Sequence, residues 1–451
     1  MPEFDTVIRG GNLVTPTGEV RMDIHISDGR IAGLGPALSS DGAREINADG
    51  LVVLPGVIDS HVHINEPGHT EWEGFETGSR AALAGGVTCL VDMPLNSIPT
   101  TVTVEALEAK KACATVNCKT DYALWGGLVP GHIDDLEPLG MAGVIGFKAF
   151  MCNSGLDEFP YADEVTLRAG MQKIARLPGM VLALHAEDNT LTTALTRKCI
   201  ESGQNSLEDF LNSRPIEAEL LAIRMAINLA GETGCPIHIV HVSCAEGIDL
   251  VSEAKAAGVD VTVETCPHYL SLNSEALETA GAVAKCAPPL RKSAAVEALH
   301  HKLMEGGIDT IGSDHSPCPA SMKEGANIFE AWGGISSLQH AGPITYSLLR
   351  DTLKQPLSTI ADLLSRKPAD RFRLPNKGSI EVGKDADLVL VDFKNTKPIT
   401  TRELHYRNPH TPYVGLVPTM RIHHTLIRGV PVYSEGKFNS DFHGRFVRPG
   451  A

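Results

Sequence analysis

The sequence predicts an α/β protein in which a (β/α)8 barrel, the TIM barrel, is joined to a smaller β-sandwich domain built from both chain ends. Three observations support this prediction. Apolar strand-like segments alternate with helical segments through the middle of the chain, polar residues fall where those strands end, and short glycine-punctuated strands occur at both chain ends. Alternating strands and helices are typical of a parallel sheet covered by helices.

Composition and charge narrow the classes of partner. The chain has 451 residues, of which 43% are hydrophobic and 21% charged, and its formal net charge is -16. A chain of this length can bury a large core and form more than one domain. A strongly negative protein is repelled by phosphate backbones and anionic lipids, so we expect a small-molecule substrate and no nucleic-acid or membrane partner.

The N-terminus and the cysteines indicate a cytoplasmic protein. The opening "MPEFDTVIRGG" lacks the basic, apolar and small-residue regions of a secretory signal, and no apolar run reaches membrane-spanning length. The ten cysteines show no C-x-x-C spacing. We therefore expect reduced thiols, most of them in the core.

Both chain ends read as small antiparallel strands separated by turns. The first part contains "TVIRGGNLV", "DIHISDGRIAGLG" and "EINADGLVVL", and the last contains "GSIEVGKDADLVLVD" and "TLIRGVPVY". Each segment is too small to bury a core alone. We therefore expect residues 1–53 and 378–451 to form one sandwich, with the barrel between them at residues 54–377.

Eight apolar strands are predicted in the middle of the chain: "LVVLPGVIDSHVHI", "GVTCLVDMP", "DYALWGGLV", "GVIGFKAF", "MVLALHAE", "PIHIVHVS", "VDVTVETCPHY" and "IDTIGSDHSP". Helical text such as "TVEALEAKKACATV", "EAELLAIRMAINLAGETG" and "GIDLVSEAKAAG" fills the gaps. The count matches a (β/α)8 barrel. A doubly wound open sheet is the alternative, but no G-x-G-x-x-G turn follows the first strand.

Polar residues gather at the carboxyl ends of these strands, where barrel enzymes form their sites. The residues are His61 and His63 on the first strand, Lys148 on the fourth, His185 on the fifth, His241 on the sixth and Asp314 on the eighth. One strand-end histidine is usually structural, but four histidines and an aspartate at one mouth suit zinc or a similar divalent ion. Five such ligands indicate two ions.

Three further histidines lie near these residues. His238 is three positions before His241, so strand alternation predicts that it points toward the helix layer, and we assign it no metal. For His268 and His315 we favour hydrogen bonding that supports the site over metal ligation.

Lys148 stands in the apolar run "FKAF", where an ammonium group is costly unless it is paired or neutralised. Two cations nearby would favour the neutral amine, which can add carbon dioxide to form a carbamate that bridges two metals. The alternatives are a lysine stem that extends to water and a Schiff base on a barrel strand. Schiff-base chemistry has no use for four convergent histidines.

The strings "DSHVHINEPG", "GFKAF", "LHAE", "IVHVSCAEG", "ETCPHYLSL" and "SDHSPCP" resemble the cyclic amidase branch of the amidohydrolase superfamily, and the resemblance covers nearly the whole chain. Within that branch "EPGHTEWEGFETGSRAALAGG", "MPLN", "KCAPPLR" and "NIFEAWGGISSLQ" are most similar to the allantoinases. The resemblance implies that His61, His63 and Asp314 hold the more buried ion, and that His185 and His241 hold the second. Carboxylated Lys148 would bridge two ions, with zinc expected first and manganese, cobalt or iron as alternatives.

The resemblance also implies an activity, which is hydrolysis of the cyclic amide of allantoin to allantoate in purine (urate) catabolism. A metal-bound hydroxide would attack, and Asp314 would act as general base and then as general acid. Substrate contacts are expected from Asn65, Asn96, Ala287, Ser316 and Trp332. The family further implies a homo-oligomer, most simply a homotetramer.

Three other functions stay open at this stage. A hydantoinase or dihydropyrimidinase would share the metal ligands and differ in the loops of the pocket. A dihydroorotase is expected to carry arginine two residues after the second histidine, where this chain has Asn65. A non-catalytic scaffold of the same fold normally lacks some metal ligands, and here all are present.

Overall fold

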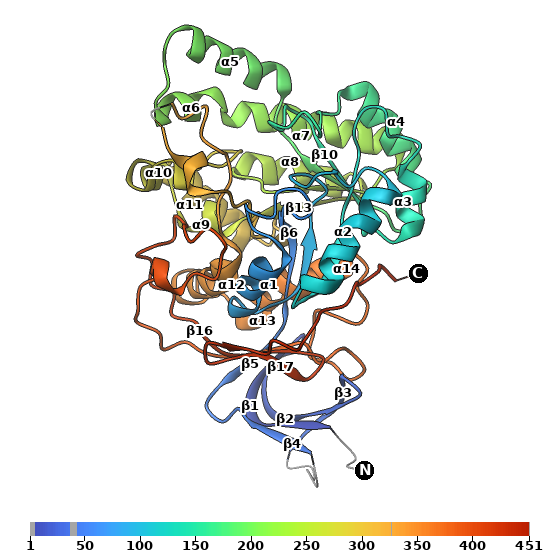
Figure 1. The fold of residues 1–451 in the computed structure, drawn as a ribbon, viewed down its shortest axis with the longest axis vertical. Helices are drawn as coiled ribbons and strands as arrows, with labels where there is room; N and C mark the ends of the chain where they lie inside the picture. The colour runs from blue at the N-terminus through green and yellow to red at the C-terminus, as the bar shows by residue number, and fades with distance from the viewer. Residues whose placement is uncertain (1–4, 37–42, 326, 451) are drawn as a thin grey trace.

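A computed structural model describes residues 5–36, 43–325 and 327–450. Figure 1 shows strands from the start and the end of the chain lying side by side at one end of the molecule, with the barrel and its helices above them. This arrangement confirms the predicted fold class, a barrel with a separate β domain made from both chain ends.

Two hydrogen-bonded groups of parallel strands form the barrel, β6-β7-β8 and β9 to β14. Trp125 separates β8 from β9, which together occupy the position of the predicted third strand. A parallel bridge between Val62 and His315 joins the first strand to the segment after β14 and closes the ring. The strands are β6 (Val57–Val62), β7 (Val87–Asp92), β8 (Asp121–Leu124), β9 (Gly126–Gly127), β10 (Phe147–Phe150), β11 (Leu182–His185), β12 (Ile237–Ile239), β13 (Val261–Thr265) and β14 (Thr310–Ile311).

Helices cover the outside of the barrel (Figure 1). In α7 the buried residues Ala218, Ala222 and Ala226 recur every four positions, so one face of the helix packs on the strands. The helices are α1 (Phe75–Ala84), α2 (Val104–Asn117), α3 (Leu136–Ala142), α4 (Glu164–Ile174), α5 (Asn189–Glu201), α6 (Leu207–Ser213), α7 (Ile216–Thr233), α8 (Ala245–Ala256), α9 (Pro267–Ser271), α10 (Ser274–Ala280), α11 (Ser293–Met304), α12 (Leu338–Ser347), α13 (Leu357–Ala361) and α14 (Lys367–Arg371). Within the described ranges, none of them is long and apolar enough to cross a bilayer.

An apolar cluster closes the end of the barrel where the strands begin. Trp125 packs edge-on against Phe372, just after α14, with 5.2 Å between the ring centroids. Residues from the starts of several strands, including Ile58, Ile145 and Val181, belong to the same buried cluster. Because this end is filled by apolar side chains, polar chemistry is confined to the opposite end.

The β domain is a single nine-stranded sheet that combines the two chain ends. Its strand order is β18-β17-β16-β15-β5-β1-β2-β3, with β4 paired to β1, and the ends meet where β15 runs antiparallel to β5. The domain boundaries at residues 53 and 377 stay a prediction. The strands are β1 (Thr6–Thr15), β2 (Gly18–Ser27), β3 (Arg30–Gly35), β4 (Arg44–Asn47), β5 (Val52–Pro55), β15 (Leu388–Asp392), β16 (Arg421–Ile427), β17 (Val430–Ser434) and β18 (Lys437–Phe438).

A buried ion cluster ties the β domain to the barrel. The Lys377 ammonium lies 2.8 Å from a carboxylate oxygen of Asp121, at the start of β8, and 2.6 Å from one of Asp387, beside β15. Arg428, which follows β16, also pairs with Asp121. Burial opposes the charge of Lys377, but the two carboxylates raise its pKa well above the usual value. The cluster therefore holds the barrel on the sheet that the chain ends build.

Candidate functional site

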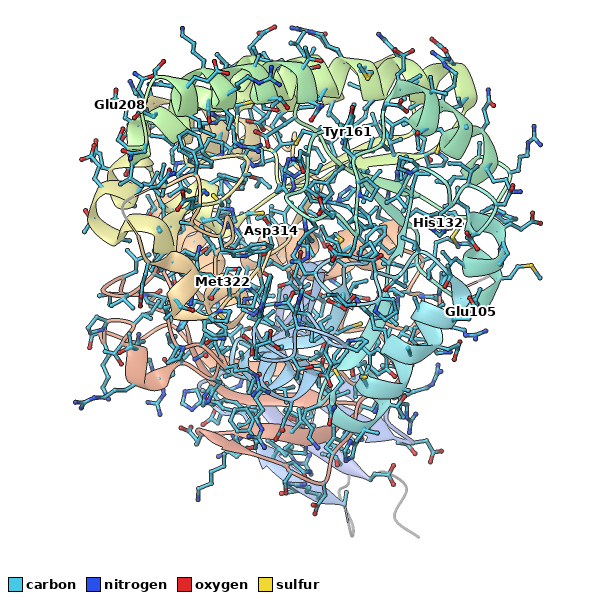
Figure 2. All side chains as sticks on the ribbon, turned by 45° about the horizontal axis from the view of Figure 1, so that its top comes forward. Glu105, His132, Tyr161, Glu208, Asp314 and Met322 are labelled. Atoms are coloured by element: carbon cyan, nitrogen blue, oxygen red, sulfur yellow. The ribbon has the colours of Figure 1, made fainter. Side chains whose placement is uncertain are left out.

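The predicted site residues meet at the open end of the barrel. Figure 2 shows Asp314 near the middle of the molecule, with Met322 and Tyr161 to either side of it. A cavity of about 770 Å³ opens there, and His61, His63, His185, His241 and Asp314 line it. Strand ends thus bring together residues that lie as much as 253 positions apart.

His61, His63 and Asp314 form one cluster. A single carboxylate oxygen of Asp314 lies 3.2 Å from Nε2 of His61 and 3.4 Å from Nε2 of His63. Burial lowers the pKa of His63 to about 4, although Asp314 opposes the shift. Burial raises the pKa of the Asp314 carboxyl, but the two histidines outweigh it and bring the pKa to about 2. At neutral pH a neutral His63 imidazole and an ionised Asp314 carboxylate, both forms that bind metal, therefore face one point.

His185 and His241 form a second pair beside the first cluster. Their ring centroids are 4.6 Å apart, and His241 lies 5.4 Å from His61. Burial lowers the pKa of His241 well below the usual value. Burial also acts to lower the pKa of His185, but Cys152 and Glu187 raise it to about 9. Metal binding at His185 therefore displaces a proton.

The predicted orientation of His238 is wrong. Strand register pairs His238 with Ala183, and Ala183 with Lys148, so His238 shares the inward face of Lys148. Its Nδ1 lies 2.7 Å from Oγ1 of Thr262. Alternation fails because β12 ends at residue 239 and His241 has φ of 43°, which turns its side chain inward as well.

Lys148 is completely buried, which rules out a side chain that extends to water. Its Nζ has no hydrogen-bond partner among the described residues, and the centre of the Phe150 ring lies 5.2 Å away. Burial lowers the pKa of Lys148 to about 8, although Asp314 and Glu264 oppose the shift. The equally buried Lys110 differs, because its Nζ binds Asp92 at 2.6 Å. Lys148 is therefore a buried amine that lacks the partner such a group normally has.

The donors present fit divalent cations. Nδ1 of His63, Nδ1 of His241 and Nζ of Lys148 are buried without hydrogen-bond partners among the described residues. Such groups are rare in folded proteins and mark sites where a ligand or ion supplies the missing interaction. Imidazole nitrogens with a carboxylate are a donor set that zinc, manganese, cobalt and iron accept.

Two carboxylates that sequence reasoning missed orient these histidines. Oε1 of Glu264, on β13, lies 2.7 Å from Nδ1 of His61. Oε2 of Glu187 lies 2.7 Å from Nε2 of His185, and Arg214 pairs with the same carboxylate. Each contact orients the imidazole ring, and in His61 it leaves Nε2 facing the Asp314 carboxylate. The available signals were weak, since Glu264 is one acid in the strand "VTVET" and Glu187 follows His185 by two positions.

His268 and His315 lie near the ligands without joining the clusters. Both ring nitrogens of His268 are buried without hydrogen-bond partners in the described part of the chain, and burial lowers its pKa to about 4. Nδ1 of His315 accepts a hydrogen bond from the backbone N–H of Ser337 at 3.1 Å, and its Nε2 lies 3.4 Å from Glu73. The supporting role expected of His315 agrees with these contacts, whereas His268 has no such bond.

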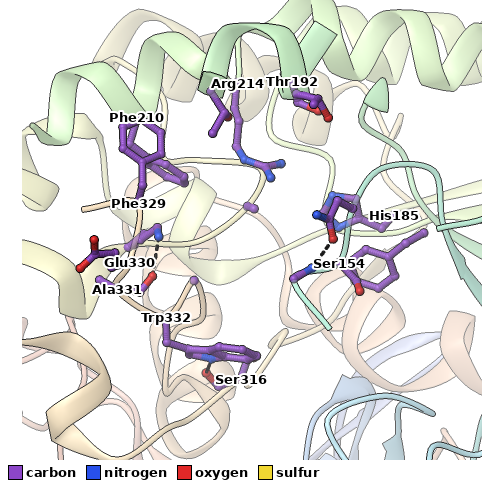
Figure 3. Close-up of a pocket in the computed structure, with 18 of the residues that line it drawn as sticks. Ser154, His185, Thr192, Phe210, Arg214, Ser316, Phe329, Glu330, Ala331 and Trp332 are labelled. Atoms are coloured by element: carbon purple, nitrogen blue, oxygen red, sulfur yellow. Dashed lines mark hydrogen bonds between the residues drawn. The ribbon is translucent and has the colours of Figure 1, made fainter. Parts of the chain in front are cut away.

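Four of the five expected substrate contacts line the cavity, namely Asn96, Ala287, Ser316 and Trp332. Figure 3 shows Trp332 beside Ser316, whose backbone carbonyl accepts from the indole Nε1 at 3.4 Å. Asn65 does not line the cavity in the part of the chain described. It is buried at φ of 65°, and its Nδ2 donates to the carbonyl of Pro317 at 3.4 Å.

Known proteins match the chain over its full length. An allantoinase of Rubrobacter xylanophilus is 47% identical over 100% of this chain and 98% of its own, and an allantoinase of Deinococcus radiodurans is 46% identical over 99% of each. Among solved structures, the L-hydantoinase (dihydropyrimidinase) from Arthrobacter aurescens superposes with a TM-score of 0.95 at 32% identity, covering 99% of this chain and 100% of that one. The dihydropyrimidinase from Brevibacillus agri gives 0.92 at 30% identity, with 98% of each covered. The amidohydrolase family model matches residues 52–432, a span that contains every residue of both histidine clusters, and the chain therefore belongs to the amidohydrolase family.

Proposed function

We propose that the protein hydrolyses the cyclic amide of allantoin to give allantoate, a step of purine catabolism. The observation that carries the proposal is the meeting of His61, His63 and Asp314 with His185 and His241 at one cavity mouth. Family membership supports the reaction class, and full-length similarity to allantoinases supports the substrate.

We further propose two divalent ions per chain, most simply zinc. His61, His63 and Asp314 would hold one ion, and His185 and His241 the other. Lys148 would bridge them as an N-carboxylated lysine, which explains a buried amine without a partner. When bound, the ions would activate a water molecule and polarise the amide carbonyl.

Asp314 is suited to move the proton of this reaction. Its carboxylate lines the cavity and stays ionised at neutral pH because its pKa lies at about 2. It can accept a proton from the attacking water and pass it to the ring nitrogen that leaves, acting first as base and then as acid. Glu264 holds His61 in position beside it.

The substrate preference rests on a missing charge. Dihydroorotate carries a carboxylate, which needs a cation in a closed pocket, and at the position expected for that cation the chain has the neutral Asn65. Allantoin carries a neutral ring and a ureido arm, which hydroxyl, amide and backbone groups match. Hydantoinase or dihydropyrimidinase activity is the second candidate, because solved structures with those names superpose closely on this fold.

Elemental analysis of purified protein tests the metal assignment. We expect close to two divalent ions per chain, with the identity of the ion depending on the growth medium. Fully active protein with one ion or fewer would contradict the binuclear site.

Assembly and location complete the proposal. We propose a cytoplasmic homotetramer, by similarity to the family. Light scattering coupled to gel filtration measures the mass of the assembly against the 48.1 kDa chain.

A further inference from the structure

A second buried lysine faces the cavity on a different wall. Lys285, in the segment "KCAPPLR", lines the cavity with 6% of its surface exposed. Its Nζ donates to the backbone carbonyl of Ala331 at 2.5 Å and lies 4.8 Å from the centre of the Phe210 ring. An ammonium has three hydrogens, so this carbonyl leaves donors unused.

Lys285 has no carboxylate partner among the described residues. The two neighbouring cations have partners: Arg214 forms an ion pair with Glu187, and the Lys323 ammonium donates to three backbone carbonyls. Burial, together with Lys323 and Arg214, lowers the pKa of Lys285 to about 7. A desolvated donor without a counter-ion is a binding position for an oxygen-rich ligand group.

The wall around Lys285 lies across the cavity from His185. Phe210, Ile328 and Ala331 form an apolar cluster there. Figure 3 shows Ala331, Phe329 and Glu330 on the opposite side of the cavity from His185. A ligand that spans the cavity with its reacting bond near His185 would therefore direct a substituent toward the wall that contains Lys285.

We propose that Lys285 is a specificity-determining residue that binds the ureido arm of the substrate. Its ammonium donates to the ureido carbonyl oxygen, and the carbonyl of Ala331 accepts from a ureido N–H. The inference rests on the proposed function, because it assumes that the ring amide reacts at the histidine clusters. It explains how a pocket of this kind distinguishes a ring with a ureido arm from the unsubstituted ring.

The test compares allantoin with hydantoin, which has the ring without the arm, on metal-loaded protein. For Lys285→Met we expect kcat/KM for allantoin to fall by about 10- to 100-fold, the effect of losing one charged hydrogen bond. For hydantoin, kcat/KM (if it is a substrate) or the inhibition constant (if it is a competitive inhibitor) should change less than about 2-fold. Lys285→Gln, which keeps a neutral donor, should fall between wild type and Lys285→Met.

Lys323 is the matched control, since it anchors the same loop through Trp332 and Gly334 but does not line the cavity. Lys323→Met should affect allantoin and hydantoin alike. If Lys285→Met also affected both equally, or left allantoin turnover unchanged, Lys285 would be a loop anchor and the inference would be wrong. Where wild-type protein binds no hydantoin at all, a loss of kcat/KM for allantoin in Lys285→Met that Lys285→Gln partly restores supports the inference, and equal losses in the two variants contradict it. Wild-type protein without activity on allantoin would instead refute the proposed function.

Discussion

Replacing Lys148 by methionine should stabilise the metal-free protein while it abolishes activity. The amine is completely buried and has no hydrogen-bond partner among the residues that the structure describes, and burial lowers its pKa from the usual value near 10.5 to about 8. Below pH 8 the lysine is protonated in both the folded and the unfolded protein, but the folded protein binds this proton less tightly. The difference lowers the free energy of unfolding by about 3 kcal/mol. Methionine fills similar volume without a charge, so this cost disappears.

The stability gain from Lys148→Met should depend on pH. The gain from Lys148→Met should be full at pH 7 and should shrink as the pH rises from about 8 toward 10.5, where the unfolded lysine also loses its proton. Urea denaturation of chelator-treated protein at pH 7 and pH 10 measures it. With metal added, the variant should bind fewer ions and lose activity by at least about 100-fold, because the proposed bridge is gone.

Lys110 provides the control for this experiment. It is equally buried, but its Nζ binds Asp92 at 2.6 Å and the carbonyl of Met93 at 2.8 Å. Lys110→Met leaves Asp92 buried without its partner and should destabilise the protein by about 3–5 kcal/mol. If Lys148→Met destabilised the metal-free protein to a similar extent, Lys148 would be a structural cation and the reasoning would be refuted.

Three further predictions concern neighbouring groups. Glu264→Gln keeps an acceptor for His61 but removes the charge, so metal retention should weaken by about 10- to 100-fold in competition with a chelator, and unchanged retention would contradict that role. Lys377→Met leaves buried Asp121 and Asp387 without their shared cation and should lower the free energy of unfolding by about 3–5 kcal/mol, measured by denaturation, with little loss of turnover at low temperature. Asn65→Arg places a bulky cation at a buried residue with positive φ, so allantoin turnover should fall more than dihydroorotate turnover rises; efficient dihydroorotate hydrolysis would contradict this expectation.

The fold and the main clusters could be predicted because they follow from local patterns. Apolar segments that end in His61, His185 and Asp314 indicate strands whose carboxyl ends meet, and such ends share one face of a barrel. Periodicity and strand alternation carry this information without any knowledge of distant contacts.

What the sequence did not reveal depends on contacts between distant segments or on broken alternation. Glu264 lies 203 positions from His61, and nothing local marks it as its partner. His241 has a positive φ, so the alternation used to orient His238 stops before it. Lys285 and Ala331 belong to separate loops whose meeting is decided by tertiary packing.

Turnover of four substrates by metal-loaded wild-type protein tests the central claim most directly. Allantoin, hydantoin, dihydrouracil and dihydroorotate should be compared side by side by kcat/KM. We expect allantoin to be preferred over dihydroorotate by orders of magnitude, because the pocket has a neutral asparagine where an arginine would bind the carboxylate. Preference for hydantoin or dihydrouracil would instead support the second candidate function. Turnover of dihydroorotate equal to that of allantoin, or no hydrolysis of allantoin at all, would contradict the account.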